Sequence, residues 1–136
     1  MKQADAFPFW DGAAPKSLLS AARLSLAAAS LVIAYGAFAP PGRAPSLMPW
    51  DKAEHFTAFF GLMALSLVSF PKTSIWRLAA LLTAVGGLVE LVQGLPMVHR
   101  DCDWKDWAAE VLGLCAVIGI IVAAKVRRSW SETGEP

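Results

Sequence analysis

The chain alternates between long apolar segments and short polar ones. Four apolar segments are long enough to cross a bilayer as helices, because a hydrocarbon core of about 30 Å needs roughly 17 to 25 mostly apolar residues. They cover residues 17–39, 52–70, 75–93 and 104–124. Proline or glycine directly follows the first three, and the basic stretch that begins at Lys125 follows the fourth. The pattern predicts an all-α, polytopic membrane protein, a bundle of four transmembrane helices.

Composition supports this class of protein. Hydrophobic residues make up 56% of the chain and charged residues 17%, whereas a soluble domain carries about 25% charged residues. The 12 Lys and Arg nearly balance the 11 acids, for a net charge of +1, so no basic excess is present to bind a nucleic acid. We expect one domain over residues 1–136, with a short cytoplasmic segment at 1–16 and a disordered tail at 129–136.

The first apolar segment has an alternative interpretation. Ala37-Phe38-Ala39 is similar to a signal-peptidase site, so this segment could be a cleaved signal peptide. Pro40, directly after that site, disfavours cleavage. Either outcome leaves the other three segments unchanged.

Positive charge is distributed unequally between the two sides of the predicted bundle. With four spans, both termini lie on one side, and that side carries 8 of the 12 Lys and Arg. Lys and Arg in short loops mark the cytoplasmic side. We therefore expect a multi-pass protein of the plasma (inner) membrane with both termini in the cytoplasm. Most of the acidic residues then lie at the outer face.

Polar residues gather near the predicted outer ends of three segments. Asp51 and His55 are four residues apart, as are Asp106 and Glu110, so each pair shares one helix face. A charge inside the membrane costs on the order of 2.5–3.5 kcal/mol, so such residues should turn inward and find partners. The candidate binding cluster comprises Asp51, Lys52, His55, Glu90, Gln93, Arg100, Asp106 and Glu110.

Structural roles remain open for several polar residues. Asp103 and Glu54 are candidate helix N-caps. Glu90 with Arg100 is a candidate ion pair that would hold the bundle together, and His99 is a candidate solvated loop residue.

Other conspicuous residues also have structural interpretations. The six tryptophans fall near predicted helix ends, which is typical of an interfacial belt. Gly86, Gly87 and Gly113 would let neighbouring helices approach closely. We expect Cys115 to be packed in mid-helix, about 20 Å from Cys102 and too far for a disulfide.

Three blocks of residues occur in a distinctive order between about residues 50 and 120. They are Asp51-Lys52-x-x-His55-Phe56-x-x-Phe59-Phe60, then Glu90-x-x-Gln93, and then Arg100 followed by Asp106-x-x-Ala109-x-x-x-Gly113. In this order and spacing, the blocks resemble the signature of the VanZ-like membrane proteins.

Two positions depart from the pattern of that family. Glu110 stands where the family usually has Asn, and Phe59 stands where it usually has Tyr. The resemblance implies an integral membrane protein of about four or more helices. The family takes its name from a protein linked to resistance to the glycopeptide teicoplanin, so the resemblance implies a location and a phenotype rather than a reaction.

Our first functional hypothesis is a binding or accessory role at the cell envelope, related to glycopeptide resistance. Lys52, His55 and Arg100 would contact the phosphate of a lipid-linked wall precursor or another anionic headgroup, while Glu90 and Asp106 orient them. The expected partners are the lipid bilayer and such a headgroup, with a homo-oligomer or a larger membrane complex as a further partner class. No nucleic acid is expected.

Two alternatives belong to other functional classes. One is an intramembrane enzyme or metal-dependent hydrolase that uses His55 and the nearby carboxylates. The sequence holds no compact metal motif such as H-x-x-x-H or H-E-x-x-H, so we expect no metal and no cofactor. The other is a structural helix bundle that serves as a partner in a larger membrane complex.

Overall fold

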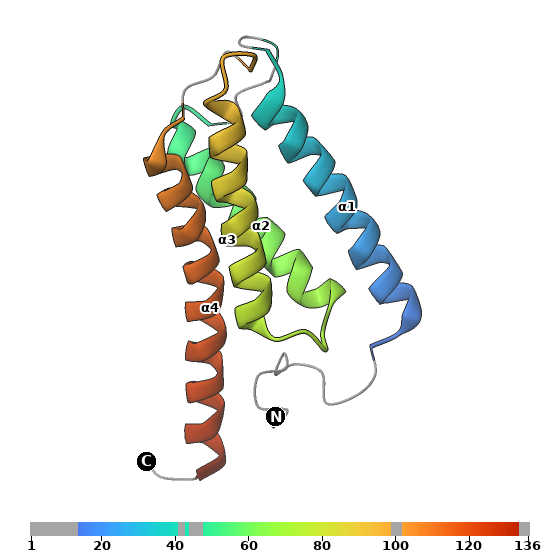
Figure 1. Cartoon of the computed structure of the whole chain (residues 1–136). Helices are drawn as coiled ribbons and strands as arrows, with labels where there is room; N and C mark the ends of the chain where they lie inside the picture. The colour runs from blue at the N-terminus through green and yellow to red at the C-terminus, as the bar shows by residue number, and fades with distance from the viewer. Residues whose placement is uncertain (1–13, 41–42, 44–47, 99–101, 134–136) are drawn as a thin grey trace.

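The computed structural model of the protein describes residues 14–40, 43, 48–98 and 102–133. Within these residues the chain forms four helices and no strand (Figure 1). The helices are α1 (Lys16–Phe38), α2 (Asp51–Ser69), α3 (Ile75–Gln93) and α4 (Trp104–Thr133). The all-α prediction is confirmed for this part of the chain. The bounds of α3 match the predicted segment, and those of α1 and α2 each lie one residue earlier than predicted.

The fourth helix is longer than predicted. It does not end near residue 124 but continues to Thr133, so the prediction of a disordered tail from residue 129 is wrong for residues 129–133. The basic residues after Ala124 end the apolar pattern, but they are good helix formers, and no Gly or Pro occurs before residue 134. The hydroxyl groups of Ser129 and Ser131 donate to carbonyl groups three residues earlier in the helix.

The two candidate N-caps have different outcomes. The Asp103 Oδ1 accepts a hydrogen bond from the Lys105 backbone N–H at 2.9 Å, which confirms Asp103 as the N-cap of α4. The prediction is wrong for Glu54, because Trp50 occupies the N-cap position of α2. Glu54 instead lies in the first turn, and its Oε1 accepts a hydrogen bond from the Met48 backbone N–H at 2.7 Å.

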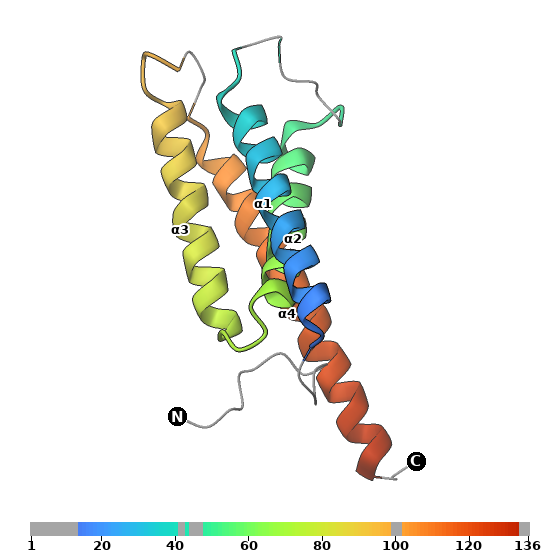
Figure 2. The same cartoon turned by 90° about the vertical axis from the view of Figure 1, so that its right-hand side faces the viewer.

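The four helices form an up-and-down bundle. The ends of α1 and α3 and the starts of α2 and α4 lie at one end, and the α2–α3 turn lies at the other, with the start of α1 (Figures 1 and 2). All the carboxylate side chains that the structure describes belong to the first end, and most of the described Lys and Arg belong to the second. We therefore call these the acidic end and the basic end. The helix α2 packs most extensively against α4 and also contacts α1 and α3.

The core is built on the shared face of α2 and α4. Its buried residues recur three or four positions apart along each helix, which places them on one stripe. Met63, at the centre of α2, has no exposed surface. The core comprises Phe59, Met63 and Leu67 from α2, Leu78 from α3, and Leu114, Val117 and Ile121 from α4.

Three of the four described helices, α1, α3 and α4, are long and apolar enough to cross a membrane. They also carry exposed large apolar side chains, such as Leu31, Leu88 and Ile120. The helix α2 is less apolar, because Asp51, Lys52, Glu54 and His55 occupy its first turns, and it exposes no large hydrophobic side chain. It is therefore the inner helix of the bundle, shielded by its neighbours. The length and apolar character expected of a membrane span are therefore confirmed for three of the four predicted segments.

Candidate functional site

All four described helices begin or end at the acidic end of the bundle, and α2, α3 and α4 contribute side chains to the site. Both α2 and α4 begin there, and α3 ends there, because consecutive helices run in opposite directions (Figure 1). Five carboxylates, one ammonium group and one imidazole lie in this region. We call them the acidic cluster, which comprises Asp51, Lys52, His55, Glu90, Asp103, Asp106 and Glu110.

Lys52 connects the start of α2 to the start of α4. Its Nζ lies 2.8 Å from Asp106 Oδ1 and 3.1 Å from Asp103 Oδ2. The ammonium group therefore neutralises charge on two carboxylates, the predicted N-cap Asp103 and the predicted site residue Asp106. The Lys105 backbone N–H and the Lys52 ammonium both hold the pKa of the Asp103 carboxyl below its usual value.

His55 connects α2 to α4 one turn deeper. Its Nδ1 lies 3.0 Å from Glu110 Oε1, and its Nε2 lies 4.0 Å from Asp51 Oδ1. The Glu110 side chain is only 2% exposed, so the imidazole is the polar partner of a buried carboxylate. This contact fixes the orientation of the imidazole ring.

Two buried carboxylate oxygens in the cluster have no hydrogen-bond partner in the part of the chain that the structure describes. Glu90 Oε2 accepts a hydrogen bond from the Asp103 backbone N–H at 3.1 Å, but Glu90 Oε1 is buried without a hydrogen bond among the described residues. The same holds for Glu110 Oε2, beside the oxygen that contacts His55. A buried carboxylate oxygen without a donor is energetically costly, so these two oxygens are available to accept a hydrogen bond or to ligate a cation.

The cluster has a donor set suited to a divalent cation. One donor atom each from His55, Glu90 and Glu110 lie within 4.8 Å of one another. Three atoms bonded to one ion at about 2.1 Å can all lie at most about 3.6 Å from one another, so these side chains need to close by up to about 1.2 Å. A second set, Asp51, His55 and Asp106, also meets the distance limit. It is the weaker set, because Lys52 already pairs with Asp106.

Glycines create the room for this arrangement. A Cβ atom at Gly86 of α3 would collide with Glu110 Oε2, and one at Gly113 of α4 would collide with the Phe56 carbonyl oxygen of α2. At Gly87, a Cβ would lie 3.3 Å from the Trp107 Nε1. The prediction that these three glycines permit close approach is confirmed. Gly86 has the most specific role, because it leaves space for the buried carboxylate of Glu110.

Two predicted site residues are not among the contacts of the acidic cluster that the structure describes, one by position and one because it lies outside the described residues. Gln93 is buried, and its Nε2 donates to the Ala37 carbonyl oxygen at 2.9 Å, so it ties the end of α3 to the end of α1. Ala37 belongs to the last turn of α1, whose carbonyl groups have no partner within the helix. Arg100 lies outside the described residues, as does His99, so the expected Glu90–Arg100 ion pair stays a prediction.

Asp103 is the cluster member that the sequence-based list of site residues left out. It was assigned a capping role only, but its second oxygen pairs with Lys52. The available signal was its spacing of three residues from Asp106, which places both carboxylates on one side of the first turn of α4.

The cysteines are both free. Cys102 is exposed close to the acidic end, just before α4 begins. The expectation that Cys115 is packed is wrong, because it lies on the outward surface of α4. Its thiol points away from the neighbouring helices, because Leu114 and Val117 occupy the inward face at this level.

Comparisons with family descriptions, with curated proteins and with solved structures find no match to this chain.

Proposed function

We propose that the chain is a VanZ-like, multi-pass membrane protein whose acidic cluster binds a divalent cation and, through that cation, the phosphate of an envelope headgroup. The observation that carries the proposal is a pair of buried carboxylate oxygens, Glu90 Oε1 and Glu110 Oε2, beside the imidazole of His55. Neither oxygen has a hydrogen-bond partner among the residues that the structure describes. The bound headgroup would belong to a lipid-linked wall precursor, and the role would be accessory rather than catalytic.

Membrane insertion is supported by the outer surface of the bundle. Large apolar side chains face outward on α1, α3 and α4. Exposed tryptophans lie near both ends, with Trp50 and Trp104 at the acidic end and Trp76 at the basic end, as in an interfacial belt. In this proposal α2 is a fourth, inner span, since its 19 residues cover about 28 Å. Its charged first turns face the acidic cluster rather than lipid.

Charge balance favours a cation as the primary ligand. Lys52 was expected to contact a phosphate directly, but it already pairs with Asp103 and Asp106. The remaining carboxylates of the cluster would repel an anion. A divalent cation held by carboxylates can also bind a phosphate of the ligand, which is how Mg²⁺ is commonly bound. The cation therefore reconciles the acidic cluster with an anionic headgroup.

The location of the headgroup follows from the distribution of Lys and Arg. The basic end carries most of the described cationic side chains, and the positive-inside rule assigns such an end to the cytoplasm. In that orientation the acidic end faces the envelope. Lipid-linked wall precursors present their phosphates at this depth, close to the hydrocarbon boundary.

A second candidate function is a metal-dependent hydrolase. The contact between His55 and Glu110 favours it, because a carboxylate that orients an imidazole is a recurrent arrangement for a general base. In this alternative the same cation would polarise a phosphoryl group of the substrate. Release of phosphate from a polyprenyl diphosphate by the purified protein would distinguish the hydrolase from the binding protein.

The test is a titration of the purified, detergent-solubilised chain with Mn²⁺ alone. We expect about one ion per chain, and about tenfold or more weaker binding in the Glu90→Gln and Glu110→Gln variants. The matched control is Glu54→Gln, which removes a carboxylate at the same end outside the cluster and should leave the affinity unchanged. Folding of each variant is checked by its thermal transition.

The headgroup is tested in a second step. Retention of a polyprenyl diphosphate in lipid nanodiscs should require Mn²⁺ and be lost with a chelator. A folded wild-type chain that binds no ion stoichiometrically would contradict the proposal. If Glu110→Gln then lowers stability, the structural interpretation of the cluster gains support instead.

A further inference from the structure

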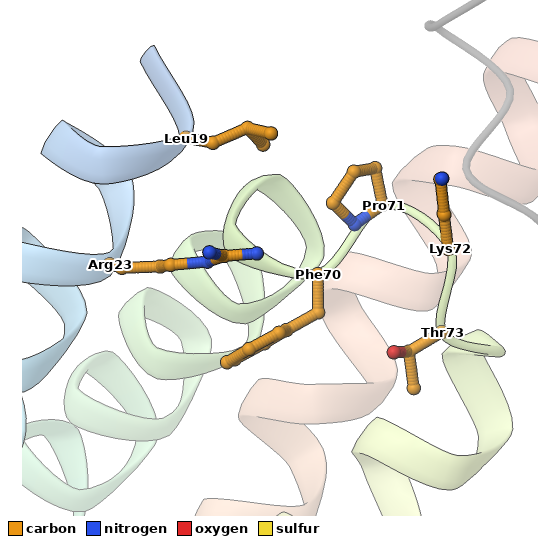
Figure 3. Close-up of a pocket in the computed structure, with 6 residues that line it drawn as sticks. All are labelled: Leu19, Arg23, Phe70, Pro71, Lys72 and Thr73. Carbon is orange, nitrogen blue, oxygen red and sulfur yellow. The ribbon is translucent and has the colours of Figure 1, made fainter. Parts of the chain in front are cut away.

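A pocket of about 250 Å³ lies at the basic end, between α1 and the turn that joins α2 to α3 (Figure 3). It is far from the acidic cluster, at the opposite end of α2. Two of its walls are cationic and the others are largely apolar. The lining residues are Leu19, Arg23, Phe70, Pro71, Lys72 and Thr73.

Arg23 enters the pocket from α1. Its Nε donates to the Ser69 carbonyl oxygen at 3.2 Å, and its guanidinium carbon lies 5.6 Å from the centre of the Phe70 ring. These contacts hold the side chain in one orientation and complete the end of α2, where carbonyl groups have no partner within the helix. A guanidinium group has five N–H donors, so four remain after the bond to Ser69. The guanidinium group extends across the pocket above the Phe70 ring (Figure 3).

Lys72 stands on the opposite side of the pocket, in the turn between α2 and α3 (Figure 3). Among the described residues, no carboxylate forms an ion pair with Lys72 or Arg23. This differs from Lys52 at the acidic end, which pairs with two. The two cations around one opening create a positive potential there, and no ion pair with a described carboxylate offsets it.

The apolar walls make the pocket more than a positively charged surface. Leu19, Phe70 and Pro71 lie beside the two cations, at the level where α1 begins and α2 ends. A ligand with a phosphate and an adjoining hydrocarbon chain would match both parts. The volume is below that of pockets for drug-sized molecules, which are about 300–1,000 Å³, so the pocket suits a small headgroup rather than a bulky soluble metabolite.

We infer that this pocket binds the phosphate of an anionic phospholipid from the leaflet that surrounds the basic end. Arg23 and Lys72 contact the phosphate, and the apolar walls contact the first part of the acyl region. Basic pockets between transmembrane helices on the cytoplasmic side recognise lipid headgroups in this way. The inference goes beyond the proposed function, because it needs neither the acidic cluster nor a divalent cation.

The test is native mass spectrometry of the full chain released from nanodiscs that contain phosphatidylglycerol and phosphatidylcholine. We expect the wild-type chain to retain phosphatidylglycerol preferentially. Lys72→Gln should weaken that retention about fivefold, the effect of one cation near an anionic surface. Arg23→Gln should weaken it further, but Lys72→Gln is the decisive variant because Lys72 is exposed in a turn and forms no bond to α2.

The matched control is Arg77→Gln. Arg77 is an exposed cation at the same end that does not line the pocket. Equal losses in Lys72→Gln and Arg77→Gln would overturn the inference, since they would indicate only a general attraction to the basic end. Equal retention of the two lipids by the wild-type chain would overturn it as well.

Two further experiments identify whether the bound phosphate belongs to the lipid or is free phosphate, and at which site it binds. Inorganic phosphate at the concentration of the lipid should not displace phosphatidylglycerol, and displacement would assign the pocket to free phosphate instead. A chelator and the Glu110→Gln substitution should leave retention unchanged. A loss in either case would mean that the lipid binds at the acidic cluster, so this inference and the proposed function can fail separately.

Discussion

The two ends of this bundle treat charged side chains in opposite ways. At the acidic end, carboxylates from α3 and α4 turn inward, and Glu90, Asp106 and Glu110 are all buried. At the basic end, Arg23 and Lys72 border an open pocket beside an exposed turn. The buried carboxylates at the acidic end have their partners inside the bundle, whereas Arg23 and Lys72 form no ion pair with a described carboxylate.

This difference in the burial of charge follows from the length of each side chain and its position along the helix. Glu90 and Glu110 are short and lie inside the apolar zone, so they need partners within the protein. Long Lys and Arg side chains near helix ends can reach the polar boundary with their charged groups. Tight helix packing is therefore needed at the acidic end and not at the basic end. The two proposed ligands match this difference, since a metal site needs exact donor positions and a lipid headgroup does not.

The largest effect is expected from labelling that separates the two ends by a membrane. Cys102, and Arg43→Cys made in a Cys102→Ser background, should react with a membrane-impermeant maleimide in intact cells. Lys72→Cys in the same background should react only after permeabilisation. Positions 43 and 72 flank α2, so opposite labelling shows that α2 crosses the membrane. Each reaction should be nearly complete or absent.

The background chain, Cys102→Ser alone, provides the control, because it retains only Cys115. Equal labelling at positions 43 and 72 would contradict a fourth span. The reverse pattern would place the acidic cluster in the cytoplasm and remove envelope headgroups as its ligands. In either case, opposite membrane faces in the proposed orientation would no longer explain why carboxylates are buried at one end and cations exposed at the other.

The next largest effect concerns helix packing near the acidic end. Gly113→Ala should lower the free energy of unfolding by about 1–3 kcal/mol, because the new methyl group meets the Phe56 carbonyl oxygen. Gly119→Ala, two turns along the same helix, has open space around its Cβ position and should be neutral or stabilising by up to about 1 kcal/mol. Unfolding in detergent measures both. Equal effects would show that α2 and α4 are not in close contact at Gly113.

A smaller effect is expected from the bond that joins α1 to the end of α2. Arg23→Gln removes the hydrogen bond to Ser69 and the contact with the Phe70 ring, and should cost about 1 kcal/mol of stability. Lys72→Gln should leave the stability of the lipid-free protein unchanged. The melting temperature in a non-ionic detergent reports both variants. A similar loss from Lys72→Gln would mean that the basic end also depends on internal pairing.

The smallest effect is a dependence of stability on pH. Because the pKa of Asp103 is lowered in the folded chain, its carboxylate contributes stability above its unfolded pKa of about 3.9. That contribution disappears as the pH falls through the lower, folded value. The difference in melting temperature between wild type and Asp103→Asn should therefore be constant near neutral pH and shrink below about pH 4.

A double-mutant cycle assigns this pH dependence to its partner. In a Lys52→Gln background, the effect of Asp103→Asn at neutral pH should be smaller, because the ammonium group is one cause of the lowered pKa. An unchanged effect would attribute all of it to the N-cap contact with the Lys105 backbone.

Much of the fold follows from the sequence pattern because the apolar segments are long and their ends carry clear signals. Pro40, Pro71 and Gly94 directly follow or adjoin the first three helices. The predicted end of α4 was wrong because the apolar segment ends near Ala124, whereas the helix continues to Thr133. Charge ends a hydrophobic segment at Lys125, but it does not end hydrogen bonding along the backbone.

The candidate site was only partly predictable. Spacing within one helix correctly placed Asp51 near His55, which the 4.0 Å separation confirms. Pairing between helices depends on how each helix rotates about its axis, and spacing within a helix does not contain that information. The contact between His55 and Glu110 therefore required the structure. Gln93 illustrates the same limit, since it turns toward α1 rather than into the cluster.

The length of α4 has a mechanical consequence. Its predicted membrane-spanning part ends near Ala124, and the nine further residues to Thr133 extend it by about 13 Å in the same direction. Figure 2 shows this extension reaching beyond the rest of the bundle. A reporter domain joined in helical continuity after Thr133 would be held on a rigid spacer, away from the lipid surface. Adding single residues at that joint should rotate the reporter by about 100° per residue. The extension can therefore set the direction of an attached reporter in distance measurements.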